Sequence, residues 1–221
     1  MAGAVSALLF ALITWQVADH GPLRTLDERL GRAVSASAVP SGLAQFFADL
    51  GNTSVALPVL LVAIGWAVWR SYRGSRGAPV TGPARRWLPP LAAALALATV
   101  PALVVPLKLW LARPGPPRMA GGAHDGFYPS GHGATAAVAY GVAALLLTHG
   151  RRRTGRLLLA AGIALLNAGV GIGLVRQGYH WPLDVLGSWC LAGVLLAVWC
   201  AVCDRRPDRA AGPRPGSGSG T

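Results

Sequence analysis

Long, nearly uninterrupted runs of apolar residues constrain this chain more than any other feature of its sequence. Six such runs occupy residues 3–18, 52–69, 87–111, 131–148, 157–175 and 181–202. A helix needs about 20 mostly apolar residues to cross the hydrocarbon core of a bilayer. Apolar residues make up 53% of the chain and charged residues only 13%, with a mean hydropathy of +0.47. The sequence therefore predicts an all-α, polytopic membrane protein, a bundle of six transmembrane helices.

The segments outside these runs leave little room for a second domain. Residues 19–50 mix charged and apolar residues at three- and four-residue spacing, which indicates an amphipathic helix on the membrane surface. Residues 203–221 are rich in Pro, Gly, Ser and Arg, which is typical of a disordered tail. We therefore expect one membrane domain over residues 1–202 and a disordered cytoplasmic tail after it.

The net charge of +12 comes from short basic clusters between the apolar runs. These clusters follow the second, fourth and sixth runs, so they lie on one side of a six-span chain, which the positive-inside rule makes cytoplasmic. Topology thus explains the charge without nucleic acid as a partner. Both termini are expected in the cytoplasm of a bacterial cell with the protein in its inner membrane, and the segments 112–130 and 176–180 are expected to face outward.

Polar residues gather at the ends of the apolar runs that face outward. The segments that carry them are 108–118, 130–132, residue 176 and 180–184. The runs 131–148 and 181–202 both begin on that side, so the unpaired N–H groups and positive dipole ends of two helices point to one place. This arrangement predicts an outward-facing active site that binds an anion.

The residue types at this site are those that hold phosphate. Ser130 is a favoured helix N-cap, and Gly131 allows the backbone to approach a ligand closely. Lys108 and a nearby arginine would add charge-assisted hydrogen bonds to phosphate oxygens. We therefore expect a lipid phosphate as the substrate, with its tail in the bilayer.

Two histidines at a phosphate site suggest that one attacks phosphorus and the other protonates the leaving oxygen, because imidazole exchanges protons near neutral pH. His180 is the expected nucleophile, and Asp184 lies one helical turn further on, where it would hold the imidazole. His132 is the expected general acid. This chemistry requires neither a metal nor a cofactor.

These residues resemble the type 2 phosphatidic acid phosphatase superfamily over about residues 50–202. The motif Pro-Ser-Gly-His at 129–132 and the pattern His-x-x-x-Asp at 180–184 match in residue and order. The resemblance implies a helical fold of six spans, metal-free hydrolysis through a phosphohistidine, and substrates such as phosphatidate, phosphatidylglycerophosphate or undecaprenyl diphosphate.

The arginines depart from the pattern of that family. Four residues separate Lys108 from Arg113-Pro114, whereas the position usual for this arginine holds Gly115. In the third motif the usual Ser-Arg places hold glycine and leucine at 173–174, and Arg176 lies closer to His180. We expect Arg113 and Arg176 to reach the phosphate from these displaced positions, with Arg118 as another candidate for the first.

Undecaprenyl diphosphate is the favoured substrate, since carrier-lipid recycling is a main use of such sites in bacterial membranes. Phosphate transfer to another acceptor is an alternative to hydrolysis. A non-catalytic lipid transporter or lipid-binding protein on the same fold is the alternative from another class. The sequence predicts no oligomeric state.

Overall fold

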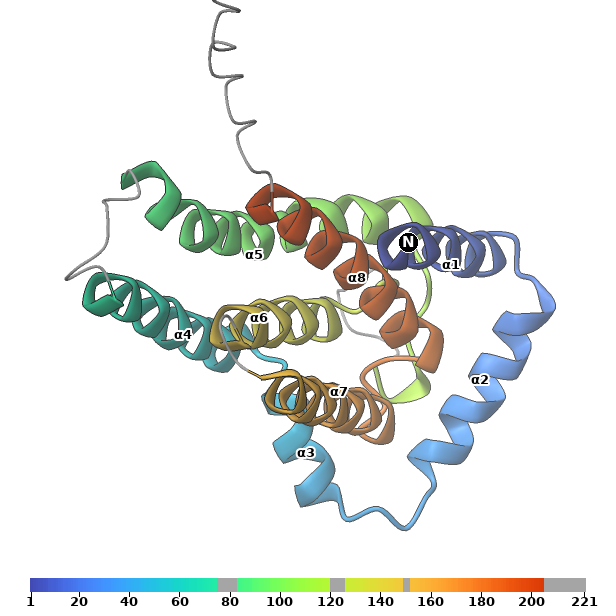
Figure 1. Ribbon diagram of the computed structural model, residues 1–221. Helices are drawn as coiled ribbons and strands as arrows, with labels where there is room; N and C mark the ends of the chain where they lie inside the picture. Colours follow the sequence, from blue (N-terminus) through green and yellow to red (C-terminus); the bar gives the residue numbers. More distant parts are fainter. Residues whose placement is uncertain (75–82, 120–125, 149–151, 205–221) are drawn as a thin grey trace, which may run out of the picture.

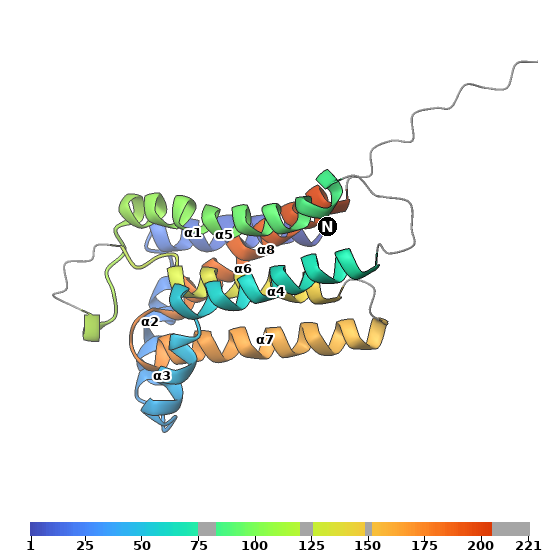
Figure 2. The ribbon, with the colours of Figure 1, turned by 90° about the vertical axis from the view of Figure 1, so that its left-hand side faces the viewer.

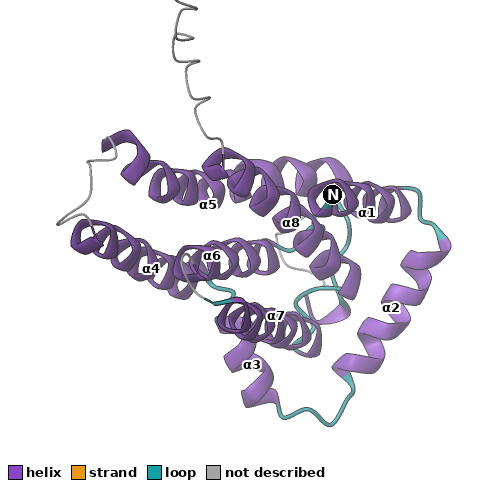
Figure 3. Cartoon of the chain, in the orientation of Figure 1, coloured by secondary structure: helices purple, strands orange, loops and turns teal. Residues whose placement is uncertain are grey.

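The computed structural model describes residues 1–74, 83–119, 126–148 and 152–204, and in these ranges it contains helices and no strand (Figure 3). The α-helices are α1 (Ala2–Ala18), α2 (Pro22–Ser35), α3 (Ser41–Asp49), α4 (Thr53–Gly74), α5 (Pro83–Leu111), α6 (Gly131–Thr148), α7 (Arg153–Arg176) and α8 (Pro182–Asp204). One turn of 3₁₀ helix, η1, covers Pro117–Met119. The predicted all-α class is confirmed. Parts of the basic segments after α4 and α6, and most of the predicted disordered tail, lie outside the described residues.

Helix α6 occupies the centre of the bundle and packs against α4, α5, α7 and α8 (Figure 1). Small residues permit this central position, because helices within a membrane pack closely where their side chains are small. Ala134, Ala136 and Ala139 are fully buried. The other long helices surround α6 and turn apolar side chains outward, as a bilayer requires.

Five of the described helices, α4 to α8, are long and apolar enough to span a membrane. Helix α1 has 17 residues, somewhat fewer than a membrane span usually needs. It is long and apolar enough to cross a membrane only when it is joined with α2, and an 87° bend separates the two helices. Helix α1 nevertheless packs along α8 and runs alongside the other long helices (Figure 2). With α1 and α2 taken as one bent span, the described helices provide up to six transmembrane spans.

Two shorter helices, α2 and α3, lie across one end of the bundle (Figure 2). They occupy the segment for which the sequence predicted a surface helix. Helix α2 exposes Leu23, Leu26 and Leu30 and buries Asp27 and Gly31 on its opposite side. The same end of the bundle holds the first residues of α6 and α8 and the last residues of α5 and α7, so the polar segments singled out in the sequence meet there.

Candidate active site

His180 and Asp184 form a buried pair where the chain enters α8. The imidazole Nδ1 of His180 lies 3.3 Å from Asp184 Oδ2, and the backbone N–H of Trp181 donates to the same oxygen at 3.0 Å. Gly178 makes the preceding turn with φ +66°, a conformation that favours glycine. Since a carboxylate only accepts, Nδ1 carries the proton that is donated and Nε2 is left with its lone pair.

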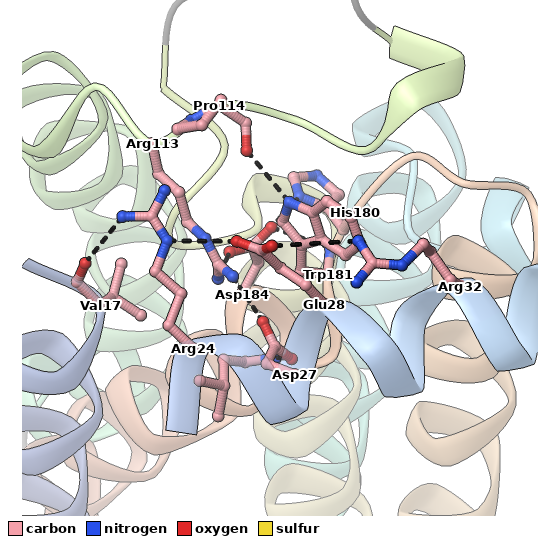
Figure 4. Close-up of polar contacts among 11 residues, drawn as sticks. Val17, Arg24, Asp27, Glu28, Arg32, Arg113, Pro114, His180, Trp181 and Asp184 are labelled. Atoms are coloured by element: carbon pink, nitrogen blue, oxygen red, sulfur yellow. Dashed lines mark hydrogen bonds and ion pairs between the residues drawn. The ribbon is translucent and has the colours of Figure 1, made fainter. Parts of the chain in front are cut away.

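Arg113 lies beneath this pair and not at an open phosphate site. Its side chain is 1% exposed, and its two terminal nitrogens bond to Asp184 Oδ1 at 2.6 Å and Asp27 Oδ2 at 2.5 Å (Figure 4). In this structure Arg113 thus pairs with carboxylates, and its expected contact with the phosphate stays a prediction. The guanidinium compensates the two buried carboxylates, and it fixes the one that holds His180.

Asp27 of α2 is a site residue that the sequence did not reveal. Besides Arg113, its carboxylate accepts a hydrogen bond from the backbone N–H of Leu183 at 2.7 Å, in the first turn of α8. Burial raises the pKa of Asp27 above its ordinary value, and Arg113 opposes that shift. Within the amphipathic pattern of α2, Asp27 looked like one more surface charge. It lies one helical turn before Gly31, and both residues are buried, so they share the side of α2 that faces the bundle.

The start of α6 is joined directly to the start of α8. The N–H of Ser130 donates to the carbonyl of Asp184 at 2.9 Å. Ser130 Oγ accepts from the N–H of Gly133 at 3.1 Å, which is the N-cap contact that the sequence predicts. A Cβ on Gly133 would collide with Ser188 Oγ of α8. Glycine at 133 thus allows the two helix N-termini to meet.

His132 and Lys108 border a large apolar cavity between α4 and α5. The cavity has a volume of about 790 Å³, and Gly131, His132 and Thr135 of α6 form part of its wall. Lys108 is half-buried at the same end. Further along, the lining is made of side chains such as Leu57, Leu61 and Ala98. The positive charge of Lys108 and the imidazole of His132 therefore lie at one end of this cavity, which we call the apolar groove.

Arg118 and Arg176 border a smaller pocket on the side of His180, with a volume of about 350 Å³. Arg118 donates to the carbonyl and the side-chain oxygen of Gln177 at 3.0 and 2.9 Å. Arg176 donates to the carbonyls of Val39 and Ser35 at 2.9 and 2.8 Å. Within the described part of the chain neither arginine forms an ion pair, so the pocket keeps their positive charge.

At the two positions where the family that this sequence resembles usually has arginines, this chain has Gly115 and Leu174. A Cβ at Gly115 would come within 2.5 Å of the ring of Phe127. That ring packs edge-on against His180, with centroids 5.9 Å apart. Leu174 is 1% exposed within the hydrophobic core.

No group of three or more metal-binding side chains occurs among the residues that the structure describes.

Tyr128 ties α1 to the site region. Its hydroxyl lies 2.8 Å from Thr14 Oγ1, and burial raises the pKa of this phenol. The same hydroxyl would lie 2.5 Å from a Cβ at Gly187 of α8. The segment ahead of Ser130 is therefore packed between α1 and α8.

Comparison with known proteins identifies the architecture around this site. The chain is similar to the crystal structure of a transmembrane PAP2-type phosphatidylglycerolphosphate phosphatase from Bacillus subtilis, with a TM-score of 0.73 and 23% sequence identity over 90% of this chain and 94% of the other. No curated protein matches significantly. The family model of the PAP2 superfamily matches residues 89–208, more than half of the sequence. The chain therefore belongs to the PAP2 superfamily, the type 2 phosphatidic acid phosphatases.

Proposed function

We propose that this protein is an integral membrane phosphatase that hydrolyses a lipid phosphate or diphosphate through a phosphohistidine, with no metal ion. The observation that carries the proposal is the buried pair of His180 and Asp184. Its geometry leaves Nε2 of His180 with a free lone pair. That nitrogen lies near the meeting N-termini of α6 and α8, where positive partial charge favours an anion.

In the first step Nε2 of His180 attacks phosphorus. The bond from phosphorus to the leaving oxygen breaks, and protonated His132 supplies the proton that this oxygen needs. Lys108, Arg118 and Arg176, with Ser130 and the backbone at Gly131, hold the other phosphate oxygens. Asp184 stabilises the positive charge that develops on His180, much as a carboxylate supports the histidine of a hydrolase triad.

In the second step water attacks the phosphorus of the phosphohistidine. His132, now neutral, accepts a proton from that water. The phosphorus–nitrogen bond breaks, and its electron pair returns to Nε2 of His180. Inorganic phosphate leaves, and both histidines regain their starting states. If an alcohol replaces the water, the same steps transfer phosphate to another acceptor.

The apolar groove beside His132 supports a lipid as the substrate. An acyl or prenyl tail in that groove would place its phosphate next to Lys108 and His132, because both residues border the same cavity. Undecaprenyl diphosphate is our favoured substrate, with phosphatidate and phosphatidylglycerophosphate as rivals. The basic loops support cytoplasmic termini and an active site on the outer face of a bacterial inner membrane.

Phosphate release from a panel of purified lipid phosphates tests the proposal. We expect His180→Ala and His132→Ala to lower the rate by about 10²-fold or more, because each removes a group that takes part in the chemistry. His20→Asn is the matched control, since His20 is exposed and has a positive φ, which asparagine tolerates. A non-catalytic lipid transporter or binding protein would instead release no phosphate, and its function would survive His180→Ala.

A further inference from the structure

A chain of hydrogen bonds connects His132 to the segment that carries His180 by way of α3. His132 Nε2 lies 2.7 Å from Asn52 Oδ1, and Asn52 Nδ2 donates to Asp49 Oδ1 at 3.1 Å. Gln45 Nε2 donates to the same Asp49 oxygen at 2.8 Å. The Gln45 Oε1 atom lies 2.8 Å from the hydroxyl of Tyr179, the residue before His180.

The direction of every bond in this chain follows from the carboxylate of Asp49. A carboxylate only accepts, so both amides must turn their NH₂ groups toward it. Asn52 therefore presents its oxygen to His132, and an amide oxygen also only accepts. The proton in the His132–Asn52 contact must then sit on Nε2 of His132, and Nδ1 is the nitrogen left to exchange protons.

The turn between α3 and α4 is fixed firmly enough to impose this geometry. Tyr140 of α6 donates its hydroxyl to the carbonyl of Leu50 at 2.6 Å. A Cβ on the buried Gly51 would lie 3.0 Å from His132 Cβ. Glycine at 51 thus allows the turn to approach His132, and Tyr140 anchors it there.

From these contacts we infer that Asn52 and Asp49 are positioning residues for His132: they hold its neutral ring with the proton on Nε2 and the lone pair of Nδ1 toward the reacting phosphate. This inference rests on the proposed function, in which His132 is the acid and base. The two histidines are then held in opposite tautomers. Asp184 directs the proton of His180 to Nδ1 and frees Nε2 for attack, whereas Asn52 keeps the proton of His132 on Nε2.

This tautomer determines which nitrogen of His132 exchanges protons during the reaction. Protonated His132 releases its Nδ1 proton to the leaving oxygen and remains neutral with Nε2–H still donated to Asn52. In the second step Nδ1 takes the proton from water, and Asp49, one residue further along the chain of bonds, stabilises the resulting positive charge. Residues 45–52 lie outside the stretch that the family model matches, so this support comes from a part of the chain that the family motifs do not include.

Nitrogen-15 NMR of histidine in the full-length protein tests the tautomer without relying on turnover. His132→Gln identifies the His132 signals. We expect the proton of neutral His132 on Nε2, and we expect Asn52→Leu to convert the ring to a mixture of tautomers. A proton on Nδ1 in the unaltered protein would overturn the inference, and so would a His132 spectrum unaffected by Asn52→Leu.

Kinetics give a second readout that a purely structural role would not produce. Asn52→Leu should lower kcat by about 10- to 100-fold, part of the about 10²–10⁴-fold that a positioned general acid or base contributes, with KM nearly unchanged. Asp49→Asn should act in the same direction. The control is Glu28→Gln, which removes one negative charge from α2 at the same end of the bundle; among the described residues Glu28 pairs with Arg24 and Arg32 and not with either histidine.

An exchange of the two residues separates positioning from folding. In the double variant Asp49→Asn/Asn52→Asp the carboxylate accepts directly from His132, and the amide can still connect it to Gln45. We expect this variant to recover most of the activity lost in Asn52→Leu, and equal loss in both would contradict the inference. If instead His180→Ala kept full activity while the tautomer was as expected, the proposed reaction would fail and the tautomer assignment would stand.

Discussion

Arg113 donates from Nη1 to Asp184 Oδ1 at 2.6 Å, and both side chains are buried, 1% and 0% exposed. This contact connects the loop after α5 to the carboxylate that holds His180. Asp27 binds the other terminal nitrogen of Arg113, so α2 is joined to the same cluster. The position of His180 thus depends on a helix that lies across the end of the bundle.

Removal of Arg113 should be strongly destabilising. Arg113→Ala leaves two carboxylates buried without their cation, and breaking a buried ion pair from one side costs about 3–5 kcal/mol. The midpoint of thermal unfolding in detergent measures the loss. Arg29→Ala on the exposed side of α2 should change stability by at most about 1 kcal/mol. Equal midpoints for the two variants would contradict the assigned role of Arg113.

Gly115→Ala should disturb the active site through Phe127. The new Cβ would lie 2.5 Å from the Phe127 ring, which packs against His180, and overpacking of this kind costs about 1–3 kcal/mol. We expect a lower unfolding midpoint together with a lower kcat. In contrast, Gly162→Ala places its Cβ in open space in α7 and should be neutral or stabilising. An unchanged kcat in Gly115→Ala would show that Phe127 does not influence His180.

A bulky residue in the apolar groove should discriminate between substrates by their tails. Ala98 is exposed and lines the groove, so Ala98→Trp should lower kcat/KM for a long-chain lipid phosphate several-fold. A short, water-soluble phosphate ester should be hydrolysed at nearly the original rate. Ala102→Trp is the control, because Ala102 lies one turn further along α5 and does not line the groove. Equal effects of the two tryptophans would argue against the groove as the site of the tail.

Vanadate should inhibit, because it adopts the pentacoordinate geometry of phosphoryl transfer and the site favours the transition state. Arg118→Met should weaken that inhibition about tenfold or more, since a hydrogen bond from a charged group is worth about 1.5–3 kcal/mol. Arg29→Met serves as the control for loss of one positive charge. Unchanged inhibition in Arg118→Met would remove this arginine from the proposed phosphate site.

A chelator should leave the rate unchanged in the proposed mechanism. The developing negative charge is stabilised by Lys108, the arginines and the N-termini of α6 and α8, which do not depend on a metal ion. Assay with and without EDTA, after dialysis, measures this. Loss of activity that returns when a divalent cation is added would refute metal-free hydrolysis.

The sequence predicted correctly those features that depend on local spacing or on the bilayer. His180 and Asp184 are one helical turn apart, so the start of a helix suffices to bring them together. Ser130 caps α6 for the same local reason. The ion pairs of Arg113 could not be predicted, because its spacing from Lys108 says nothing about α2, which approaches from a distant part of the chain to supply Asp27.

By itself the sequence determined a helical bundle in a membrane, with two histidines at one end, because apolar run length and motif order depend only on neighbouring residues. Only the tertiary structure decided which polar groups satisfy one another there. It turned Arg113 inward onto Asp27 and Asp184, and it brought Asn52 and Asp49 to His132. Such choices arise from packing between distant helices, where a buried charge or amide must find a partner, and no local pattern records which partner that is.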